Sequence, residues 1–163
     1  MTSAAMSSFS LSILQIDLKD DAEWTPLIIA SSAGHVDCIE ALIAACADLN
    51  TTTSNGQAAI HYASSRNRQA VVERLIAAEA DVTVRDKYGS TPLHRASSVG
   101  HVKVVSLLLA AGGDPNAQDN EGNTCLHLAA EGRNKEVFDR LKEAGGRPDI
   151  RNKEELTPAD LVS

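Results

Sequence analysis

The sequence has 163 residues, of which 43% are hydrophobic but only 3% aromatic, so Ala, Leu, Val and Ile must fill its interior. Its formal net charge of −7 opposes non-specific binding to nucleic acid, which needs a cationic face to displace counterions. The chain has no run of 18 apolar residues that could span a membrane. From the charge and the apolar pattern together, we expect neither nucleic acid nor a membrane as its partner.

The cysteines and the N-terminal residues indicate in which cellular compartment the protein is expected. Cys38, Cys46 and Cys125 are odd in number and form no Cys-x-x-Cys pair, which favours a reduced intracellular compartment. Residues 1–15 lack the basic start and the long apolar centre of a signal peptide. We therefore expect the protein in the cytoplasm, the nucleus or both.

A motif recurs every 33 residues, at Thr25-Pro26-Leu27, Ala58-Ala59-Ile60, Thr91-Pro92-Leu93, Thr124-Cys125-Leu126 and Thr157-Pro158-Ala159. Three further columns keep the same phase: His61, His94 and His127; Asp20, Asp86 and Asp119; Gly56, Gly89 and Gly122. A period near 33 with a Thr-Pro-Leu-His core resembles the ankyrin repeat. The resemblance implies an all-α solenoid of helix–turn–helix units with projecting β-hairpin turns.

At the start of the chain, residues 1–19 are predicted to form a half repeat that covers the first full unit. Their apolar residues keep its register, with Met6, Phe9 and Ile13 matching Ile39, Leu42 and Cys46. Ile16-Asp17 likewise matches Leu49-Asn50. A frayed tail is the alternative interpretation of this stretch.

Four full units follow, at 20–52, 53–85, 86–118 and 119–151, and a partial unit at 152–163 completes a single domain of residues 1–163. In unit 86–118, Gly89 suits a turn with positive φ, and Thr91 and Pro92 suit the N-cap and first position of a helix. Gly100 should end that helix. The buried side of the second helix is predicted at Val104, Val105, Leu107, Leu108 and Leu109. Neither helix can bury its apolar face alone, so each unit needs its neighbours.

The histidine column suggests a metal site, but the spacing argues against one. Equivalent residues of successive units lie about 10 Å apart, the usual helix–helix distance, whereas zinc needs nitrogens within about 2.1 Å of one ion. We expect His61, His94 and His127 to bind backbone and neighbouring turns instead. Ile28 fills this column in the first unit, so the first joint should lack the polar link.

No nucleophile elbow, phosphate-binding loop or zinc-protease motif is present. Cys125 stands at a helix start, where its pKa could be lowered, but a small apolar filler is the simpler interpretation. We therefore expect no catalytic residue, no cofactor and no metal, and a protein that is not an enzyme.

A binding surface is predicted where side chains are free of the stack, on the hairpin tips and the outer side of each first helix. The candidates are Asp21, Trp24, Ser32, Asn55, Tyr62, Ser65, Arg66, Lys87, Tyr88, Ser90, Arg95, Ser98, Asn120, Glu121, Asn123 and Glu131.

Two features of this surface favour a protein partner. Trp24 is the single Trp, and aromatic residues and Arg are enriched at binding hot spots, although Trp24 could instead pack on the preceding hairpin strand. Arg66, Arg68, Lys87 and Arg95 gather basic charge in the middle of an acidic chain, which suits an acidic patch on a partner.

Several segments resemble the gankyrin-like family of proteasome-assembly chaperones, from about Asp17 to Ala159. They are Asp20-Asp21-Ala22-Glu23-Trp24-Thr25-Pro26-Leu27, His61-Tyr62-Ala63-Ser64-Ser65-Arg66-Asn67-Arg68 and Gln118-Asp119-Asn120-Glu121-Gly122-Asn123-Thr124.

This resemblance implies a chaperone for assembly of the proteasome regulatory particle. Members of the family hold the C-terminal domain of one ATPase subunit along a concave face and block its premature docking on the core particle. Arg66 matches a basic contact position of the family. We expect a monomer that acts in this way. A small ankyrin-type inhibitor of cyclin-dependent kinases, or a generic ankyrin scaffold, is the alternative.

Overall fold

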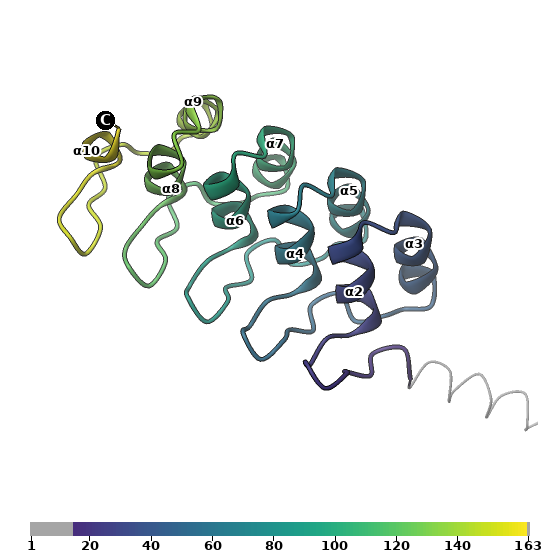
Figure 1. Ribbon diagram of the computed structural model, residues 1–163. Helices are drawn as coiled ribbons and strands as arrows, with labels where there is room; N and C mark the ends of the chain where they lie inside the picture. The colour runs from purple at the N-terminus through teal and green to yellow at the C-terminus, as the bar shows by residue number, and fades with distance from the viewer. Residues whose placement is uncertain (1–14, 163) are drawn as a thin grey trace, which may run out of the picture.

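The computed structural model describes residues 15–162, so most of the predicted half repeat 1–19 lies outside the described residues. The described helices are α2 (Pro26–Ala33), α3 (Val36–Ala44), α4 (Ala59–Ser65), α5 (Gln69–Ala77), α6 (Pro92–Val99), α7 (Val102–Ala110), α8 (Cys125–Glu131), α9 (Lys135–Glu143) and α10 (Pro158–Leu161). They form an elongated stack in chain order (Figure 1). The predicted all-α solenoid is confirmed; the division of the chain into units and one domain stays a prediction.

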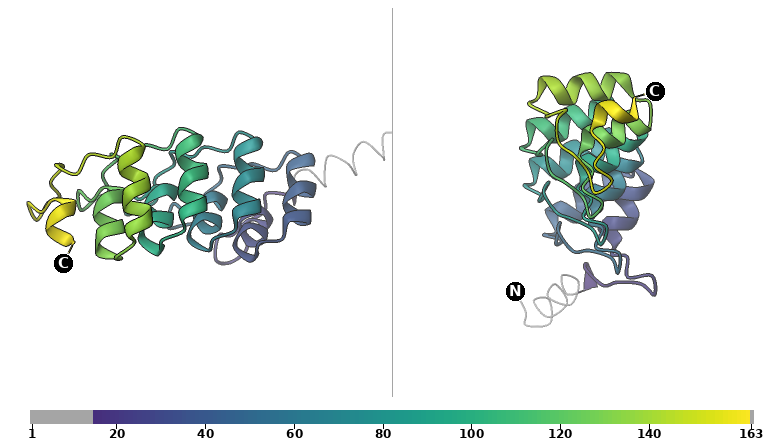
Figure 2. Two further views of the ribbon diagram at one scale, coloured as in Figure 1. Left: turned by 90° about the horizontal axis from the view of Figure 1, so that it is seen from above. Right: turned by 90° about the vertical axis from the view of Figure 1, so that its left-hand side faces the viewer.

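The helices form two rows. The first helices of the units, α2, α4, α6 and α8, pack on one another, and α3, α5, α7 and α9 form a second row beside them. Figure 2 shows the two rows from above and, end on, the loops stacked along one side. This arrangement leaves the loops and the outer sides of the first helices as one continuous surface.

The projecting loops differ from the prediction in one respect, because residues 15–162 contain no β-strand. Each loop is hairpin-shaped and closes by two backbone hydrogen bonds. In the third loop, Asp86 N–H donates to Ser90 O at 3.0 Å and Gly89 N–H donates to Asp86 O at 2.9 Å. The loops are too short and too tightly turned to build a regular ladder, and we refer to them as hairpin loops.

Helix boundaries follow the local sequence. Thr25 and Thr91 are N-caps whose hydroxyls accept from Ile28 N–H at 3.3 Å and His94 N–H at 3.4 Å, and a proline follows each of them. Gly100 ends α6 in the left-handed conformation with φ of 87°, as predicted. The N-cap of α4 is Ala58, which has no side-chain oxygen to accept a hydrogen bond.

The core runs along the seam between the two rows of helices. Its largest fully buried side chains include Leu27, Ile60, Leu93 and Leu126 of the first helices and Leu75, Leu108 and Leu141 of the second. In α7, Val104, Val105 and Leu108 are buried as predicted. Leu107 and Leu109 are only partly buried, because each is turned about 100° around the helix from its neighbour Leu108, which faces the seam.

The histidine column links each first helix to the next hairpin loop. His94 Nδ1 lies 3.2 Å from Thr91 N, and its Nε2 lies 3.1 Å from Asn123 O. His61 and His127 make the same pair of contacts, their Nε2 atoms reaching Ser90 O and Leu156 O at 2.9 Å. Each ring thus accepts from its own helix start and donates to the following unit.

Candidate functional site

The predicted binding surface follows the hairpin loops and the first helices, and we call the fourteen candidates that stay at least partly exposed there the concave strip. They are Asp21, Trp24, Asn55, Tyr62, Ser65, Arg66, Lys87, Tyr88, Arg95, Ser98, Asn120, Glu121, Asn123 and Glu131.

Two further candidates are buried in the stack, which corrects the prediction that their side chains are free. Ser32 is only 6% exposed, and its carbonyl accepts from Arg68 Nε at 3.1 Å, so the Arg68 side chain reaches across to α2. Ser90 is 7% exposed because its N–H donates to Asp86 Oδ1 and its carbonyl accepts from His61. Both serines therefore belong to the scaffold.

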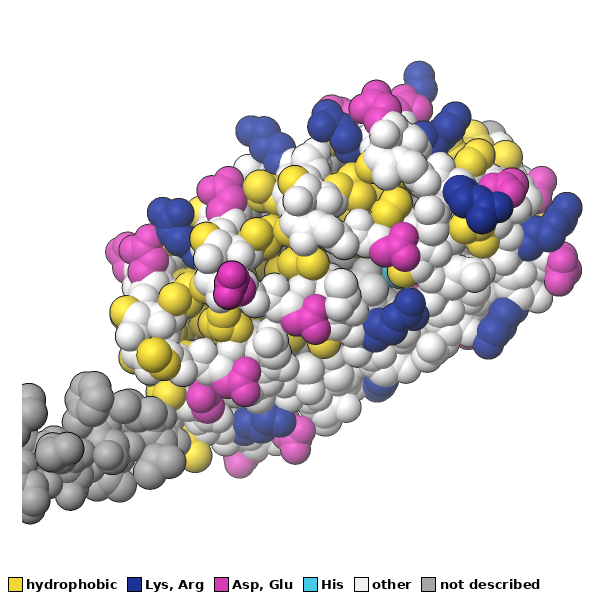
Figure 3. All heavy atoms as spheres, turned by 180° about the vertical axis from the view of Figure 1, so that it is seen from behind, with side chains coloured by type: hydrophobic (Ala, Val, Ile, Leu, Met, Phe, Trp, Pro, Cys, Tyr) yellow, Lys and Arg dark blue, Asp and Glu magenta, His cyan; other side chains and the backbone are white. Residues whose placement is uncertain are grey.

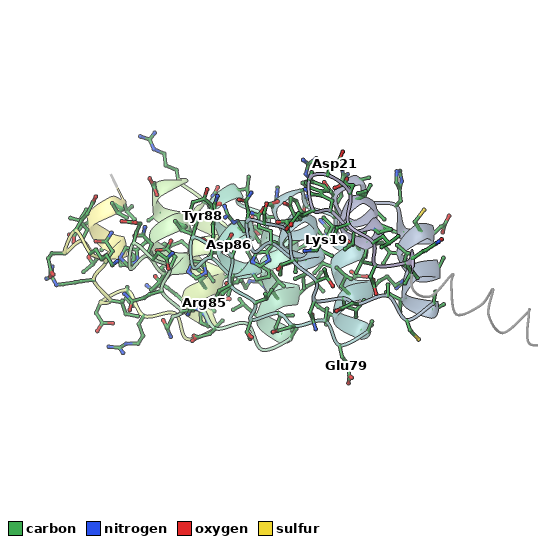
Figure 4. All side chains as sticks on the ribbon, turned by 90° about the horizontal axis from the view of Figure 1, so that it is seen from below. Lys19, Asp21, Glu79, Arg85, Asp86 and Tyr88 are labelled. Carbon is green, nitrogen blue, oxygen red and sulfur yellow. The ribbon has the colours of Figure 1, made fainter. Side chains whose placement is uncertain are left out.

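The middle of the strip is a cluster of cations around one exposed aromatic ring. Tyr88, at the tip of the third hairpin loop, is 54% exposed. Lys87 Nζ lies 5.0 Å from the centre of its ring and Arg95 Cζ lies 5.6 Å from it, which is within cation–π range. The view onto the hairpin loops places Tyr88 beside Asp86 near the middle of the molecule (Figure 4).

Arg95 is not the free cation that the sequence suggested. Its Nε and Nη2 both donate to Asp86 Oδ2, Nε at 3.1 Å, and the Asp86 side chain is fully buried. Burial by itself would raise the pKa of Asp86, but the hydrogen bonds from Arg95 and from Ser90 N–H hold that pKa below its ordinary value. The pair therefore carries opposite charges at neutral pH, and Arg95 has little net charge to offer.

Arg66 and Lys87 are the cations of the strip that remain available. Arg66 caps the end of α4, is exposed, and makes no ion pair with the described residues. Arg68, by contrast, is engaged with Ser32. The available positive charge of the strip therefore lies in the second and third units.

Trp24 packs in a direction that the sequence did not indicate. Its ring lies 4.6 Å from that of Tyr62, centre to centre, with 47° between the planes. Tyr62 belongs to the following unit, so the pair joins the first unit to the second. Both rings remain partly exposed on the strip.

The C-terminal part of the strip is acidic and hollowed. A hollow of ≈ 150 Å³ is lined by Glu121, Asn123, Glu131, Asn152, Glu154 and Leu161. Asn123 accepts from Asn152 Nδ2 at 2.9 Å, so its side chain holds the neighbouring loop in place. Asn120 does the same on the other side, since its N–H donates to Tyr88 O and its Nδ2 to Lys87 O.

The remaining candidates are smaller or more peripheral. Asp21 and Asn55 are exposed at the first and second hairpin loops. Ser65 is the last residue of α4 and Ser98 lies in the last turn of α6, and their hydroxyls donate to their own helices at Tyr62 O and Arg95 O. They line the strip without a charged or apolar group to offer.

Sequence reasoning missed the apolar members of one row. Tyr62 and Arg95 stand 33 residues apart, and the same column contains Ile29, Leu128 and Leu161. Ile29 is 47% exposed and the two leucines are partly exposed, so the row is largely apolar. Extending the 33-residue register from Tyr62 and Arg95 would have found them.

On the face seen from behind, acidic and basic side chains are intermixed along the whole length, with apolar side chains between them (Figure 3). That face lacks the separation of charge found along the strip.

Three other kinds of site, a reactive thiol at Cys125, a metal site and a membrane span, find no support in the described residues. Burial raises the pKa of the Cys125 thiol to about 12, so this cysteine is a buried filler and not a nucleophile. Within residues 15–162, no group of three or more His, Cys, Asp and Glu could hold a metal ion. None of the helices in the same range has the length and apolar character that crossing a bilayer requires.

Comparison with known proteins agrees with this architecture. The family model described as "Ankyrin repeats (3 copies)" matches residues 3–86 and again residues 71–154. No curated protein matches the sequence in the corresponding search. Ankyrin repeats are protein–protein interaction scaffolds, and the two matches together cover most of the chain. The chain belongs to the ankyrin-repeat family.

Proposed function

We propose that this ankyrin-repeat protein holds a protein partner along the concave strip, and that the partner is the C-terminal domain of a proteasomal ATPase subunit. In this role it is an assembly chaperone of the proteasome regulatory particle, present in the cytoplasm, the nucleus or both. The observation that carries the proposal is Arg66, an exposed arginine that makes no ion pair with any residue of 15–162 and stands one helical turn after the partly exposed ring of Tyr62.

The charges of the strip indicate which kind of surface the partner should have. Arg95 is neutralised by Asp86, which leaves Arg66 and Lys87 to attract an acidic patch. An ion pair that becomes partly dry at an interface can contribute about 1.5–7 kcal/mol of coupling, whereas an exposed rim pair contributes about 0–1 kcal/mol. Arg66 follows Tyr62 by one helical turn, since its N–H donates to Tyr62 O at 3.1 Å, and the apolar area of the Trp24–Tyr62 pair would help to exclude water.

The proposed mechanism requires binding alone. The row of loops and first helices offers a long surface, and a partner held along it is kept from docking elsewhere. The inference that the protein acts without catalysis and as a monomer is part of the same proposal. The similarity of its variable positions to gankyrin-like proteins supports the identity of the partner.

Isothermal titration calorimetry with an isolated proteasomal ATPase C-terminal domain, at two salt concentrations, tests the proposal. Arg66→Glu should weaken binding and reduce its salt dependence. Lys103→Glu is the matched control, because Lys103 is also exposed but lies on α7, in the other row of helices. Circular dichroism should show both variants folded.

Three outcomes would count against the proposal. Equal losses in the two variants would mean that net charge, and not the strip, determines binding. Unchanged affinity of Arg66→Glu at low salt would remove the proposed contact. Binding to a cyclin-dependent kinase in a parallel titration, with none to the ATPase domain, would favour the kinase-inhibitor alternative.

A further inference from the structure

At the hairpin edge of the joints between the later units, two polar links cross the joint and a third set of hydrogen bonds holds the receiving loop in shape. At the joint between units 86–118 and 119–151, which we call the third joint, His94 Nε2 reaches Asn123 O at 3.1 Å. Asp119 Oδ1 accepts from Glu121 N–H and Asn123 N–H, both at 2.9 Å, and so clamps the loop that receives the histidine. Asn120 N–H donates to Tyr88 O at 3.0 Å and ties the two loop tips together.

The joint between units 20–52 and 53–85, the first joint, has none of these links. Ile28 replaces the histidine. Among the described residues, Thr53 N–H is the only donor to Gln57 O, the carbonyl that such a histidine would reach. Thr53 replaces the aspartate, and its Oγ1 is buried without any hydrogen-bond partner. Within residues 15–162, no backbone hydrogen bond joins the loop 20–24 to the loop 53–57.

The opposite edge of the first joint is tied as well as any other. Arg68 Nε donates to Ser32 O at 3.1 Å, and His101 and Asn134 make the equivalent bonds in the next two joints. Asp81 N–H donates to Asn50 Oδ1 at 2.9 Å, and Arg74 pairs with Glu40 at 2.7 Å. α2 also packs on α4 as closely as α4 packs on α6.

We propose that the first joint is a hinge, which opens at the hairpin edge while its helix edge stays closed. The unit 20–52 tilts as a body about the second helices, and the loop 20–24 moves away from the loop 53–57. The Trp24–Tyr62 pair spans the edge that opens, so opening separates the two rings. The third joint, with all three links, stays shut under the same conditions.

This hinge bears on binding because the concave strip crosses it. Trp24 lies on the first unit, and Tyr62 and Arg66 lie on the second. A partner that contacts both units binds the closed form only, so its apparent affinity falls with the fraction that is open. A change that closes the hinge should therefore tighten binding without touching the partner.

Amide hydrogen exchange of the full chain, followed residue by residue by NMR, tests the hinge. In the native protein, Gly56 N–H of the second loop should exchange at least about 10-fold faster than Gly122 N–H, since each missing link changes an opening equilibrium by about 2- to 12-fold. The two amides make the same bond, to Thr53 O at 2.8 Å and to Asp119 O at 2.9 Å. The amide of Asp81, at the helix edge of the same joint, should exchange as slowly as the equivalent Arg147 N–H.

Two variants of Thr53 should add the missing hydrogen bonds to the second hairpin loop, and one variant of Asp119 should remove them from the fourth. Thr53→Asp should slow the exchange of Gly56 about 10-fold, by adding two bonds of the kind that Asp119 makes. Thr53→Asn is the uncharged version and copies Asn152, whose Oδ1 accepts from Glu154 N–H and Leu156 N–H at 3.0 Å. Asp119→Thr should speed the exchange of Gly122 and leave Gly56 unchanged.

The proposal is overturned if Gly56 and Gly122 exchange at equal rates in the native protein. It is also overturned if Asp81 exchanges as fast as Gly56, because the whole unit would then separate without a hinge. A lack of effect of both Thr53 variants on the exchange of Gly56 would remove the loop clamp as the cause.

Discussion

The third joint and the first joint are built from equivalent pairs of helices but from different loops. In both joints the helices pack on their neighbours through apolar side chains such as Leu and Ile. Leu93 belongs to this packing at the third joint, and Leu27 at the first. At the third joint, His94 and Asp119 also fix the hairpin edge, whereas Ile28 and Thr53 leave that edge of the first joint without polar links. The comparison teaches that apolar packing sets the fold, while a few polar side chains set the stiffness of each joint.

The largest effect should come from the shared apolar packing. Leu108 is fully buried in α7, and Leu108→Ala should lower the free energy of unfolding by about 2–5 kcal/mol, because it removes apolar contacts and leaves a cavity. Urea denaturation measures the change. Lys103→Ala in the same helix, at an exposed position, is the control and should stay within about 0.5 kcal/mol. A comparable loss in both variants would contradict the assigned core.

A smaller effect should follow when the first joint's residue is copied into the third. His94→Ile leaves Thr91 N–H and Asn123 O without the ring that joins them, and should cost about 1–3 kcal/mol. The free energy of unfolding in urea gives the number. A neutral His94→Ile would mean that the histidine links contribute nothing and that the two joints do not differ in the way described.

The same links predict a pH dependence. Burial lowers the pKa values of His61 and His94 below 6.5 in the folded protein, while the unfolded chain keeps ordinary values. The unfolded chain therefore binds protons first on acidification, so this stability is fully present above about pH 6.5 and is lost as the pH falls towards the folded-state pKa values.

Each histidine can contribute a slope of at most about 1.4 kcal/mol per pH unit. Unfolding free energies measured between pH 7 and 5 should show the decline, and the double variant His61→Ile with His94→Ile should have a shallower slope. An unchanged slope in that variant would contradict the assignment.

The smallest effect should come from the helix edge of the first joint. Arg74 pairs with Glu40 at 2.7 Å, but both side chains are about half exposed, and solvent screens the pair. Arg74→Ala should cost no more than about 1 kcal/mol. A double-mutant cycle with Glu40→Ala isolates the pair; a coupling well above that value would mean that one ion pair, rather than several contacts, keeps this edge closed.

The fold could be predicted because its signals are local and periodic. Thr91, Pro92 and Gly100 set the limits of α6 by capping chemistry alone, and the phase of His61, His94 and His127 placed each ring against the next loop. The lack of a polar link from position 28 at the first joint was also predicted, since Ile28 stands in the histidine column. Asp48 N–H donates to Asp17 Oδ1 as Asp81 N–H does to Asn50 Oδ1, while the half repeat at 1–19 stays a prediction.

The candidate site was less predictable, because its properties depend on contacts between units. The pairing of Arg95 with Asp86 needs the turn geometry of a whole loop, and the same holds for the burial of Ser90. Ser32 is buried because a long side chain, Arg68, arrives from the next unit. Trp24 could have packed on either neighbour, and its contact with Tyr62 is seen only once the two units are stacked.

One measurement tests the difference between the joints most directly, because Trp24 is the single Trp and lies at the first joint. Unfolding in urea should be followed on one sample by Trp24 fluorescence and by circular dichroism of the helices. We predict that the fluorescence transition occurs at lower urea than the helix transition, and that Thr53→Asp brings the two together. Coincident transitions in the native protein would mean that the first joint is as firm as the others and would contradict the account.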